Sequence, residues 1–228
     1  MSTKSEQLKK LNEKMSQCSK CVLRKGCTQV VPGEGSAEAQ ILFIGEGPGK
    51  KEDESGRPFV GAAGKFLDEM LGMIGLSRED ACPAPISTKL NSSGNIDNKK
   101  LSKQKIWCGV YIANVVKCRP PQNRDPLPEE ATTCWPWLLE QIKIIQPKLI
   151  VTLGRHSMER FLPNQKISQV HGKAMRREIE GIGKQVFYTL YHPAAALYNG
   201  GMRETLIKDF KRIPKVLEAI DKAQLPAD

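Results

Sequence analysis

The chain has 228 residues, of which 35 are Lys or Arg and 25 are Asp or Glu, giving a formal net charge of +10. This length suits one α/β domain, and the charge favours a polyanionic partner, with nucleic acid first and an anionic membrane surface second. No apolar run approaches the roughly 18 residues of a membrane span, and Met1–Gln17 lacks the apolar core of a signal peptide. We therefore expect a single cytoplasmic domain of residues 1–228, whose seven cysteines serve metal or redox chemistry rather than disulfides.

The first predicted element is an N-terminal helix over Ser5–Ser16, where apolar residues recur at helical spacing. Two cysteines, Cys18 and Cys21, follow it directly, and Cys27 stands six residues further on. The stretch Gln29–Ala39 contains Gly and Pro and predicts a loop. The N-terminal part of the chain thus places a short helix and a cysteine pair before the first predicted strand.

A strand, a glycine loop and a helix follow in immediate succession. Ile41–Ile44 predicts a buried parallel strand, and Gly45-Glu46-Gly47-Pro48-Gly49 is a turn that lets another group approach the backbone closely. After a polar arm, Lys50–Arg57, we expect Phe59 to be exposed and Ala62–Ile74 to form an amphipathic helix. This arrangement favours a ligand site at the carboxyl end of a strand, with a tight loop and a core phenylalanine as the alternative.

The remainder of the chain alternates predicted strands and helices, after a polar segment with little periodicity. We interpret residues 82–105 of that segment as a surface insertion. The alternation predicts a three-layer α/β/α fold around a central, mainly parallel four-stranded sheet. The later predicted strands are Val110–Val116, Leu149–Gly154 and Val186–Tyr191, and the later predicted helices are Pro128–Ile145, Ser157–Leu162 and Glu204–Ala223.

Four of the seven cysteines are spaced as ligands of one metal site. Cys18 and Cys21 form a C-x2-C pair, whereas Cys118 follows a predicted strand and Cys134 lies in the next helix, so all four thiolates can face one point. Such a set binds zinc or an iron–sulfur cluster, and the spacing alone does not choose between them. Free buried cysteines are the alternative, which explains a C-x2-C pair poorly. The other three cysteines, Cys27, Cys82 and Cys108, receive no role.

Three motifs, taken together and in order, resemble those of the uracil-DNA glycosylases that carry an iron–sulfur cluster, the family-four type. The first motif runs from Gly45 to Gly64, the second is Asn114–Pro121 and the third is His192–Ala195. The similarity extends from about Cys18 to Phe210 and includes the four-cysteine set. The segment between about residues 77 and 108 departs from the family, because it is longer and more polar than the family pattern leads us to expect.

The resemblance implies a uracil-DNA glycosylase-like fold and a DNA repair enzyme that flips uracil out of DNA and hydrolyses its N-glycosidic bond, leaving an abasic site. It implies that Phe59 stacks on uracil, that Asn114 reads the edge of the base, and that His192 donates a hydrogen bond to the uracil oxygen that gains charge. The turn of Gly45, Glu46 and Gly47 would contact the base. A [4Fe–4S] cluster would be held by Cys18, Cys21, Cys118 and Cys134.

The motifs leave open which group orients the attacking water. The best-known uracil glycosylases have an aspartate at the position of Gly47, so this chain must orient its water differently. Glu46 and Glu52 are the candidates, with Asp53 behind them. Any nearby carboxylate would also stabilise an oxocarbenium-like sugar.

The expected partner is uracil-containing DNA, double- or single-stranded. Lys117 and Arg119 are candidate phosphate contacts, and Leu197 is a candidate wedge that enters the DNA where the base leaves. A solvated surface and an ordinary helix start are the alternatives for these residues. We expect a nucleoid-associated monomer without membrane contact, and a replication clamp or a DNA polymerase is a candidate protein partner. Other basic residues expected near the metal site are Lys20, Arg24, Lys25 and Arg124.

Other functions are compatible with parts of this pattern. A DNA-binding or DNA-scanning module with a structural iron–sulfur cluster would show little or no turnover, and a glycosylase could act on another deaminated base. An iron–sulfur electron carrier would not require Phe59, Asn114 and His192 together. Incubation with a uracil-containing oligonucleotide, followed by alkali, separates the enzyme from the binding module.

Overall fold

The computed structural model describes residues 2–78 and 109–223 of the chain. The expected insertion at 82–105, together with Cys82 and Cys108, lies outside the described residues. Within the two described ranges, no helix is long and apolar enough to cross a membrane.

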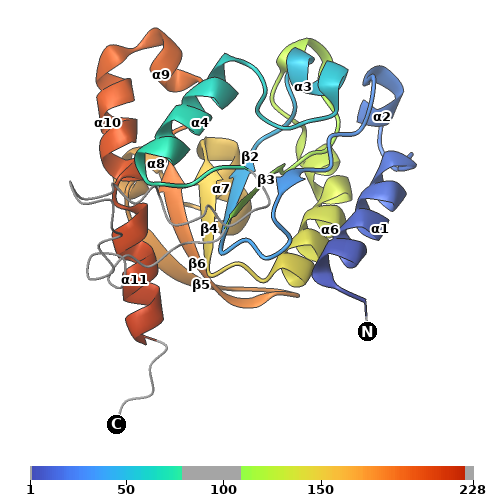
Figure 1. The fold of residues 1–228 in the computed structure, drawn as a ribbon. Coiled ribbons are helices and arrows are strands. Elements are labelled where there is room, and N and C mark those ends of the chain that lie inside the picture. The colour runs from blue at the N-terminus through green and yellow to red at the C-terminus, as the bar shows by residue number, and fades with distance from the viewer. Residues whose placement is uncertain (1, 79–108, 224–228) are drawn as a thin grey trace, which may run out of the picture.

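A six-stranded sheet forms the centre of the fold, with the strands in the order β1-β3-β2-β4-β6-β5 (Figure 1). The four inner strands are parallel to one another. β2, β3 and β4 are buried along their whole length, as expected of apolar runs covered by helices on both faces. The inner strands are β2 (Ile41–Gly45), β3 (Val110–Asn114), β4 (Leu149–Leu153) and β6 (Gly183–Leu190).

The α/β class predicted from the sequence is confirmed, and within the described residues the sheet has two more strands than the four expected. β1 (Glu34–Gly35) pairs antiparallel with β3, and β5 (Ala174–Ile179) pairs antiparallel with β6. β1 has only two residues, and most of β5 is exposed. Neither edge strand therefore contains the buried apolar run from which the inner strands were predicted.

Alternate side chains of the strands pack into two separate cores on opposite faces of the sheet. Leu42 and Ile44 of β2 belong to the first core, and Ile41 and Phe43 belong to the second. Helices α1, α6, α7 and α8 cover the first core, and α4, α10 and α11 cover the second, which gives three layers (Figure 1). The bounds are α1 (Lys4–Ser16), α2 (Leu23–Gly26), α4 (Ala62–Met73), α6 (Pro128–Ile145), α7 (Arg155–Phe161), α8 (Ile167–Val170) and α9 (Ala195–Tyr198).

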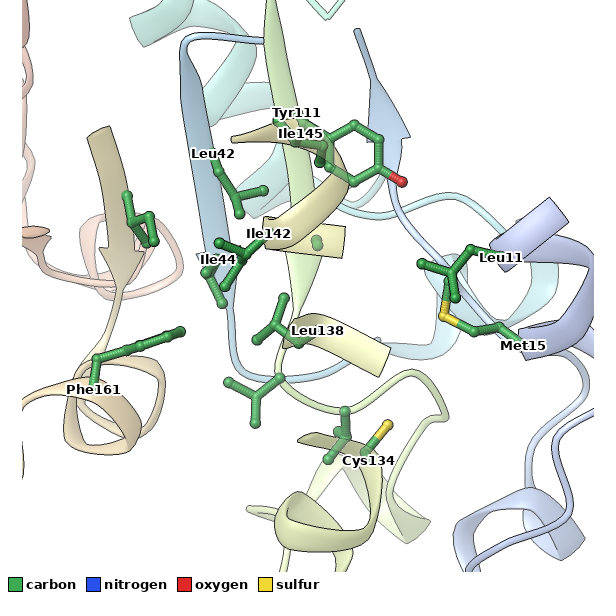
Figure 2. Packing of buried hydrophobic residues seen from close by; sticks show 14 of the residues in the cluster. Leu11, Met15, Leu42, Ile44, Tyr111, Cys134, Leu138, Ile142, Ile145 and Phe161 are labelled. Atoms are coloured by element: carbon green, nitrogen blue, oxygen red, sulfur yellow. The ribbon is translucent and has the colours of Figure 1, made fainter. Parts of the chain in front are cut away.

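The first core extends from the sheet to the segment that contains the predicted metal ligands. Figure 2 shows Leu138 and Ile142 of α6 beside Ile44 of β2, with Met15 of α1 in the same cluster. Cys134, on α6, belongs to this cluster and is buried. A group bound to Cys134 would therefore lie against the apolar core rather than in solvent.

Two stretches differ from the predicted elements. The polar arm Lys50–Arg57 contains a short helix, α3 (Lys50–Ser55), which ends at Gly56 with a φ of 71°. The predicted helix Glu204–Ala223 is divided into α10 (Gly200–Phe210) and α11 (Ile213–Ala223). Pro214 explains the division, because it has no backbone N–H and cannot continue the hydrogen bonds of α10 by donating to the Phe210 carbonyl oxygen, whereas proline is tolerated in the first turn of α11.

Candidate active site

A cleft of about 420 Å³ lies where the carboxyl ends of β2 and β3 meet the segment that follows β6. Its volume is within the usual range of small-molecule sites, roughly 300–1,000 Å³. The structure brings residues of all three predicted motifs together around it. The lining residues that matter below are Glu46, Gly47, Glu52, Phe59, Asn114, Asp125, His192 and Leu197.

Gly45 allows Asn114 and Phe59 to lie close to one another. Gly45 and Asn114 are partners in the parallel ladder between β2 and β3. A Cβ atom at position 45 would collide with Asn114 Oδ1 and would lie 2.6 Å from the Phe59 ring. Any side chain at this position would therefore displace the amide or the ring.

Phe59 is buried, so the expectation of an exposed aromatic is wrong. Only 6% of the residue is exposed, and its ring stacks beside that of His192 with 5.6 Å between the centroids. Its backbone φ is 53°, a left-handed conformation that is rare for a bulky residue. The ring lies against Gly45 and forms part of the cleft wall instead of facing solvent.

Asn114 presents an unpaired acceptor at the end of β3. The residue is 1% exposed, and among the described residues its Oδ1 has no hydrogen-bond partner. A buried polar atom without a partner costs about 1–3 kcal/mol. A ligand that offers an N–H group to Oδ1 would remove that cost.

Lys117 holds the backbone of Asn114 and does not reach the surface. Its Nζ donates hydrogen bonds to the Asn114 carbonyl oxygen at 2.8 Å and to Gln141 Oε1 at 2.6 Å. The residue is 2% exposed. The prediction that Lys117 contacts DNA phosphates is therefore wrong, because both acceptors hold the ammonium group inside the protein.

His192 is held as a neutral hydrogen-bond donor. The Ala194 backbone N–H donates to His192 Nδ1 at 3.2 Å, so Nδ1 is an acceptor and the ring proton resides on Nε2. Burial lowers the pKa of His192 to about 4, although the nearby Glu52 carboxylate opposes that shift. At neutral pH the imidazole can therefore donate a hydrogen bond from Nε2 without carrying a charge.

Glu46 lies in a small network of charged side chains at the cleft. His156 Nε2 is 2.8 Å from Asp125 Oδ2 and 4.0 Å from Glu46 Oε2. Burial raises the pKa of Glu46, His156 opposes the increase and Asp125 adds to it. Ligand atoms of Glu46, Asp125 and His156, one from each residue, lie close enough together to bind a cation. The positively charged Arg155 guanidinium, however, lies 3.0 Å from His156 Nε2 and occupies that nitrogen. We therefore interpret the trio as a charge network that surrounds Glu46.

Two other predicted carboxylates have structural partners. Glu52 lines the cleft, and its Oε1 accepts hydrogen bonds from the backbone N–H groups of Val60 and Gly61, both at 2.8 Å. Asp53 is 3% exposed, and both of its oxygens accept from the Thr28 backbone N–H. Asp53 therefore connects α3 to the backbone at Thr28, and of the three predicted carboxylates only that of Glu46 accepts no hydrogen bond from the backbone within the described residues.

The four predicted metal ligands line one small cavity at the end of α1. Cys18, Cys21, Cys118 and Cys134 all contribute to its wall, and each is a free cysteine. Two donors accompany the sulfurs. The Lys117 backbone N–H donates to Cys134 Sγ at 3.3 Å, and the buried Trp137 Nε1 has no acceptor within the described part of the chain. Sulfur atoms of a bound group could accept hydrogen bonds from these two N–H donors.

The remaining predicted DNA contacts lie near the cleft with different exposure. Leu197 is 40% exposed at the cleft edge, and the next residue, Tyr198, is 91% exposed. Arg119 is half-buried and donates to Asn123 Oδ1 at 2.7 Å. Arg124, a weaker candidate, forms two bonds to the buried Glu130 carboxylate.

The sequence reasoning missed Arg78, Asp125 and His156. Arg78 donates to the Pro58 and Phe59 carbonyl oxygens, both at 2.6 Å. Asp125 and His156 meet Glu46 from two other segments of the chain. These contacts join segments without a local sequence pattern, so periodicity and motif spacing could not reveal them.

A family model and several individual relatives match this chain, and they agree on one family. The model of the uracil DNA glycosylase superfamily matches residues 32–219. The chain is 43% identical to a type-4 uracil-DNA glycosylase of Sulfurisphaera tokodaii over 91% of this chain and 84% of that protein. It is 43% identical to the type-4 enzyme of Archaeoglobus fulgidus, over 91% and 92% of the two chains. The type-4 enzyme of Thermotoga maritima is 38% identical over 98% of this chain and 96% of its own.

The environment of His192 predicts an unusual titration. Because the folded-state pKa of about 4 is below the ordinary value of 6.5, the unfolded chain takes up this proton first as the pH falls. The contribution of neutral His192 to stability is thus fully present above about pH 6.5 and is lost between about 6.5 and 4. Histidine NMR resonances should show His192 titrating near pH 4. A midpoint between 6 and 7 would contradict the desolvated, neutral state.

Proposed function

Because the chain belongs to the uracil DNA glycosylase superfamily, we propose that it is a DNA repair glycosylase that hydrolyses the N-glycosidic bond of uracil in DNA and leaves an abasic site. The observation that supports this best is the convergence of Gly45, Phe59, Asn114 and His192 at one cleft. A base inside a duplex cannot reach such a cleft, so the enzyme must take it out of the stack.

Asn114 is the proposed reader of the base edge. Uracil presents an N–H donor beside a carbonyl acceptor, and an amide side chain offers the complementary acceptor and donor. The unpaired, buried Asn114 Oδ1 supplies the acceptor for the uracil N3–H. Cytosine has the reverse pattern at these positions and would leave both pairs unmatched. Discrimination therefore follows from the cost of unpaired polar groups in a buried site.

His192 and Phe59 have different proposed roles. When the glycosidic bond breaks, negative charge collects on the uracil oxygen, and the His192 Nε2–H is the donor proposed to stabilise it. A neutral donor that is already oriented by Ala194 needs no reorganisation as the charge develops. Phe59 stacks on the flipped base, and this interaction is already present before bond cleavage.

Glu46 is the carboxylate that we assign to the attacking water. It lines the cleft, and its neighbours Asp125 and His156 hold it in a charge network. Glu52 shares the cleft, but one of its oxygens holds the backbone at Val60 and Gly61. A carboxylate at Glu46 would also stabilise positive charge on the sugar, so its charge contributes apart from any proton transfer.

We also assign a [4Fe–4S] cluster to Cys18, Cys21, Cys118 and Cys134, as a structural group. The support for this assignment is the C-x2-C pair with two further cysteines at one cavity, together with the motifs that resemble the family-four glycosylases. The Trp137 N–H and the Lys117 backbone N–H are donors suited to the cluster's sulfurs. Bound there, the cluster would join the segment after α1 to the one after β3.

Contacts outside the cleft complete the proposal. Leu197 enters the duplex where the base leaves, and Arg119 contacts a phosphate. A monomeric state, a nucleoid location and a clamp or polymerase partner stay predictions from the sequence alone. The competing functions, a scanning module or a glycosylase for another deaminated base, are separated by the assay that follows.

Substitution of His192 should reduce chemistry more than binding. We expect His192→Ala to lower single-turnover release of uracil by about a hundredfold or more, because one preorganised donor to a developing anion is typically worth that much. Phe59→Ala should instead weaken binding to uracil-containing DNA, by about tenfold, since stacking is present in the bound state. Alkali cleavage of a labelled oligonucleotide measures release, and a gel or anisotropy titration measures binding.

Three results would overturn parts of this assignment. An unchanged release rate in His192→Ala would remove His192 from the catalytic motif. A parent protein that binds the DNA without releasing uracil would favour the scanning module. Release of a different deaminated base in preference to uracil would change the substrate.

The cluster assignment predicts the metal content. Anaerobically purified protein should be brown and contain about four iron atoms per chain. Cys118→Ser or Cys134→Ser should lose iron, whereas Cys27→Ser, a buried neighbour outside the four, should retain it. One zinc atom per chain in the parent, or iron loss in Cys27→Ser alone, would contradict the assignment.

A further inference from the structure

We infer that Arg78 is a positioning residue for uracil excision, which acts by fixing the backbone on both sides of Phe59. The inference rests on the proposed function, because it needs Phe59 to stack on the flipped base. Arg78 follows α4 and belongs to none of the three motifs.

The Arg78 guanidinium binds the carbonyl oxygens of the loop that contains Phe59. Its Nη1 donates to Pro58 O and its Nη2 donates to Phe59 O, both at 2.6 Å, while Gly64 O lies 3.4 Å from Nη2. Its Nε pairs with Asp68 of α4, which orients the guanidinium plane. Only 11% of the Arg78 side chain is exposed, so water and salt weaken these charge-assisted bonds little.

These two bonds set the direction of the Phe59 Cα–Cβ bond, from which the ring projects. Each peptide group is a rigid plane, and the planes that carry Pro58 O and Phe59 O meet at the Phe59 Cα atom. Holding both oxygens on one planar fork therefore fixes φ and ψ of Phe59. That restraint matters because a φ of 53° is sparsely populated for phenylalanine and persists only where the surroundings impose it.

The opposite edge of the same loop is held by a negative charge. Glu52 Oε1 accepts from the N–H groups of Val60 and Gly61, just after Phe59. Arg78 thus binds the loop's carbonyl groups and Glu52 binds its N–H groups. A lysine at position 78 could keep the charge near Asp68, but its single ammonium group lacks the planar fork that spans both carbonyls.

A matched control is available on α10, where Arg203 pairs with a residue of α4. Arg203 pairs with Glu69 at 2.8 Å and lies over the Phe66 ring at 4.0 Å, so its removal also costs α4 an ion pair. Its partners are on α4 and not in the loop that holds Phe59. Arg203→Ala therefore reproduces the loss of a surface ion pair without releasing Phe59.

The test is a double-mutant cycle with Phe59, measured by thermal unfolding and by single-turnover uracil release at enzyme concentrations below saturation, where weaker binding also slows release. We expect Arg78→Ala to slow release by several-fold, up to the roughly tenfold loss of Phe59→Ala, since misplacing a binding group slows the reaction. Arg78→Lys should recover only part of the rate, and Arg203→Ala should stay within about twofold of the parent. Arg78→Ala combined with Phe59→Ala should be about as slow as Phe59→Ala alone, because Arg78 acts only through the ring.

Two results would overturn the inference while the parent still releases uracil. The first is that the losses of Arg78→Ala and Phe59→Ala multiply in the double variant, which would mean that Arg78 acts independently of the ring. The second is a parental rate in Arg78→Lys, which also decides the matter if Arg78→Ala does not fold. A parent that releases no uracil would instead contradict the proposed function.

Discussion

The candidate site depends on the close approach of three groups at one glycine. β2 and β3 run parallel with Gly45 opposite Asn114, and the Phe59 ring packs on the same point from the following loop. A methyl group at position 45 would collide with the amide oxygen and crowd the ring. The backbone of Gly45 has no positive φ and would accept other residues. The packing around it is therefore what requires a glycine. The geometry of Asn114 and Phe59 thus depends on the absence of a side chain at position 45.

Buried charges then hold the groups that meet at Gly45. The Lys117 ammonium binds the Asn114 carbonyl oxygen, and the Lys117 backbone N–H binds Cys134 Sγ. Lys117 therefore connects Asn114, through its side chain, to the cysteine cavity, through its backbone. On the other side, Arg78 and Glu52 hold the two edges of the loop that contains Phe59. Both sets of bonds are at least partly shielded from water, which strengthens charge-assisted hydrogen bonds.

The elements that the sequence predicted correctly are those with a continuous local signal. The four inner strands are apolar runs, and α1, α4 and α6 have apolar residues at helical spacing. Because parallel strands end at the same edge of a sheet, the positions of Asn114 and His192 near the glycine loop also followed from the motif order. The division of the last helix had a local signal as well, since Pro214 stands in the predicted helix.

The features that the sequence did not predict are set by contacts between distant segments. Phe59 is buried because Gly45 leaves room for its ring, and Lys117 is buried because Gln141 and Asn114 offer acceptors. The sequence around Lys117 and around Phe59 contains no local pattern from which these distant partners could be predicted. The same holds for His156, which begins a helix and meets Asp125 from another loop.

The most direct test of this account compares two glycine-to-alanine variants of the same chain. Gly45→Ala should lower single-turnover uracil release by about a hundredfold or more, because it displaces Asn114 or Phe59 by an ångström or so. Gly72→Ala, on α4, should release uracil at the parental rate, since no atom lies within 4 Å of a Cβ there and alanine favours the helix. Parental activity in a folded Gly45→Ala variant would contradict the claim that this close approach builds the site.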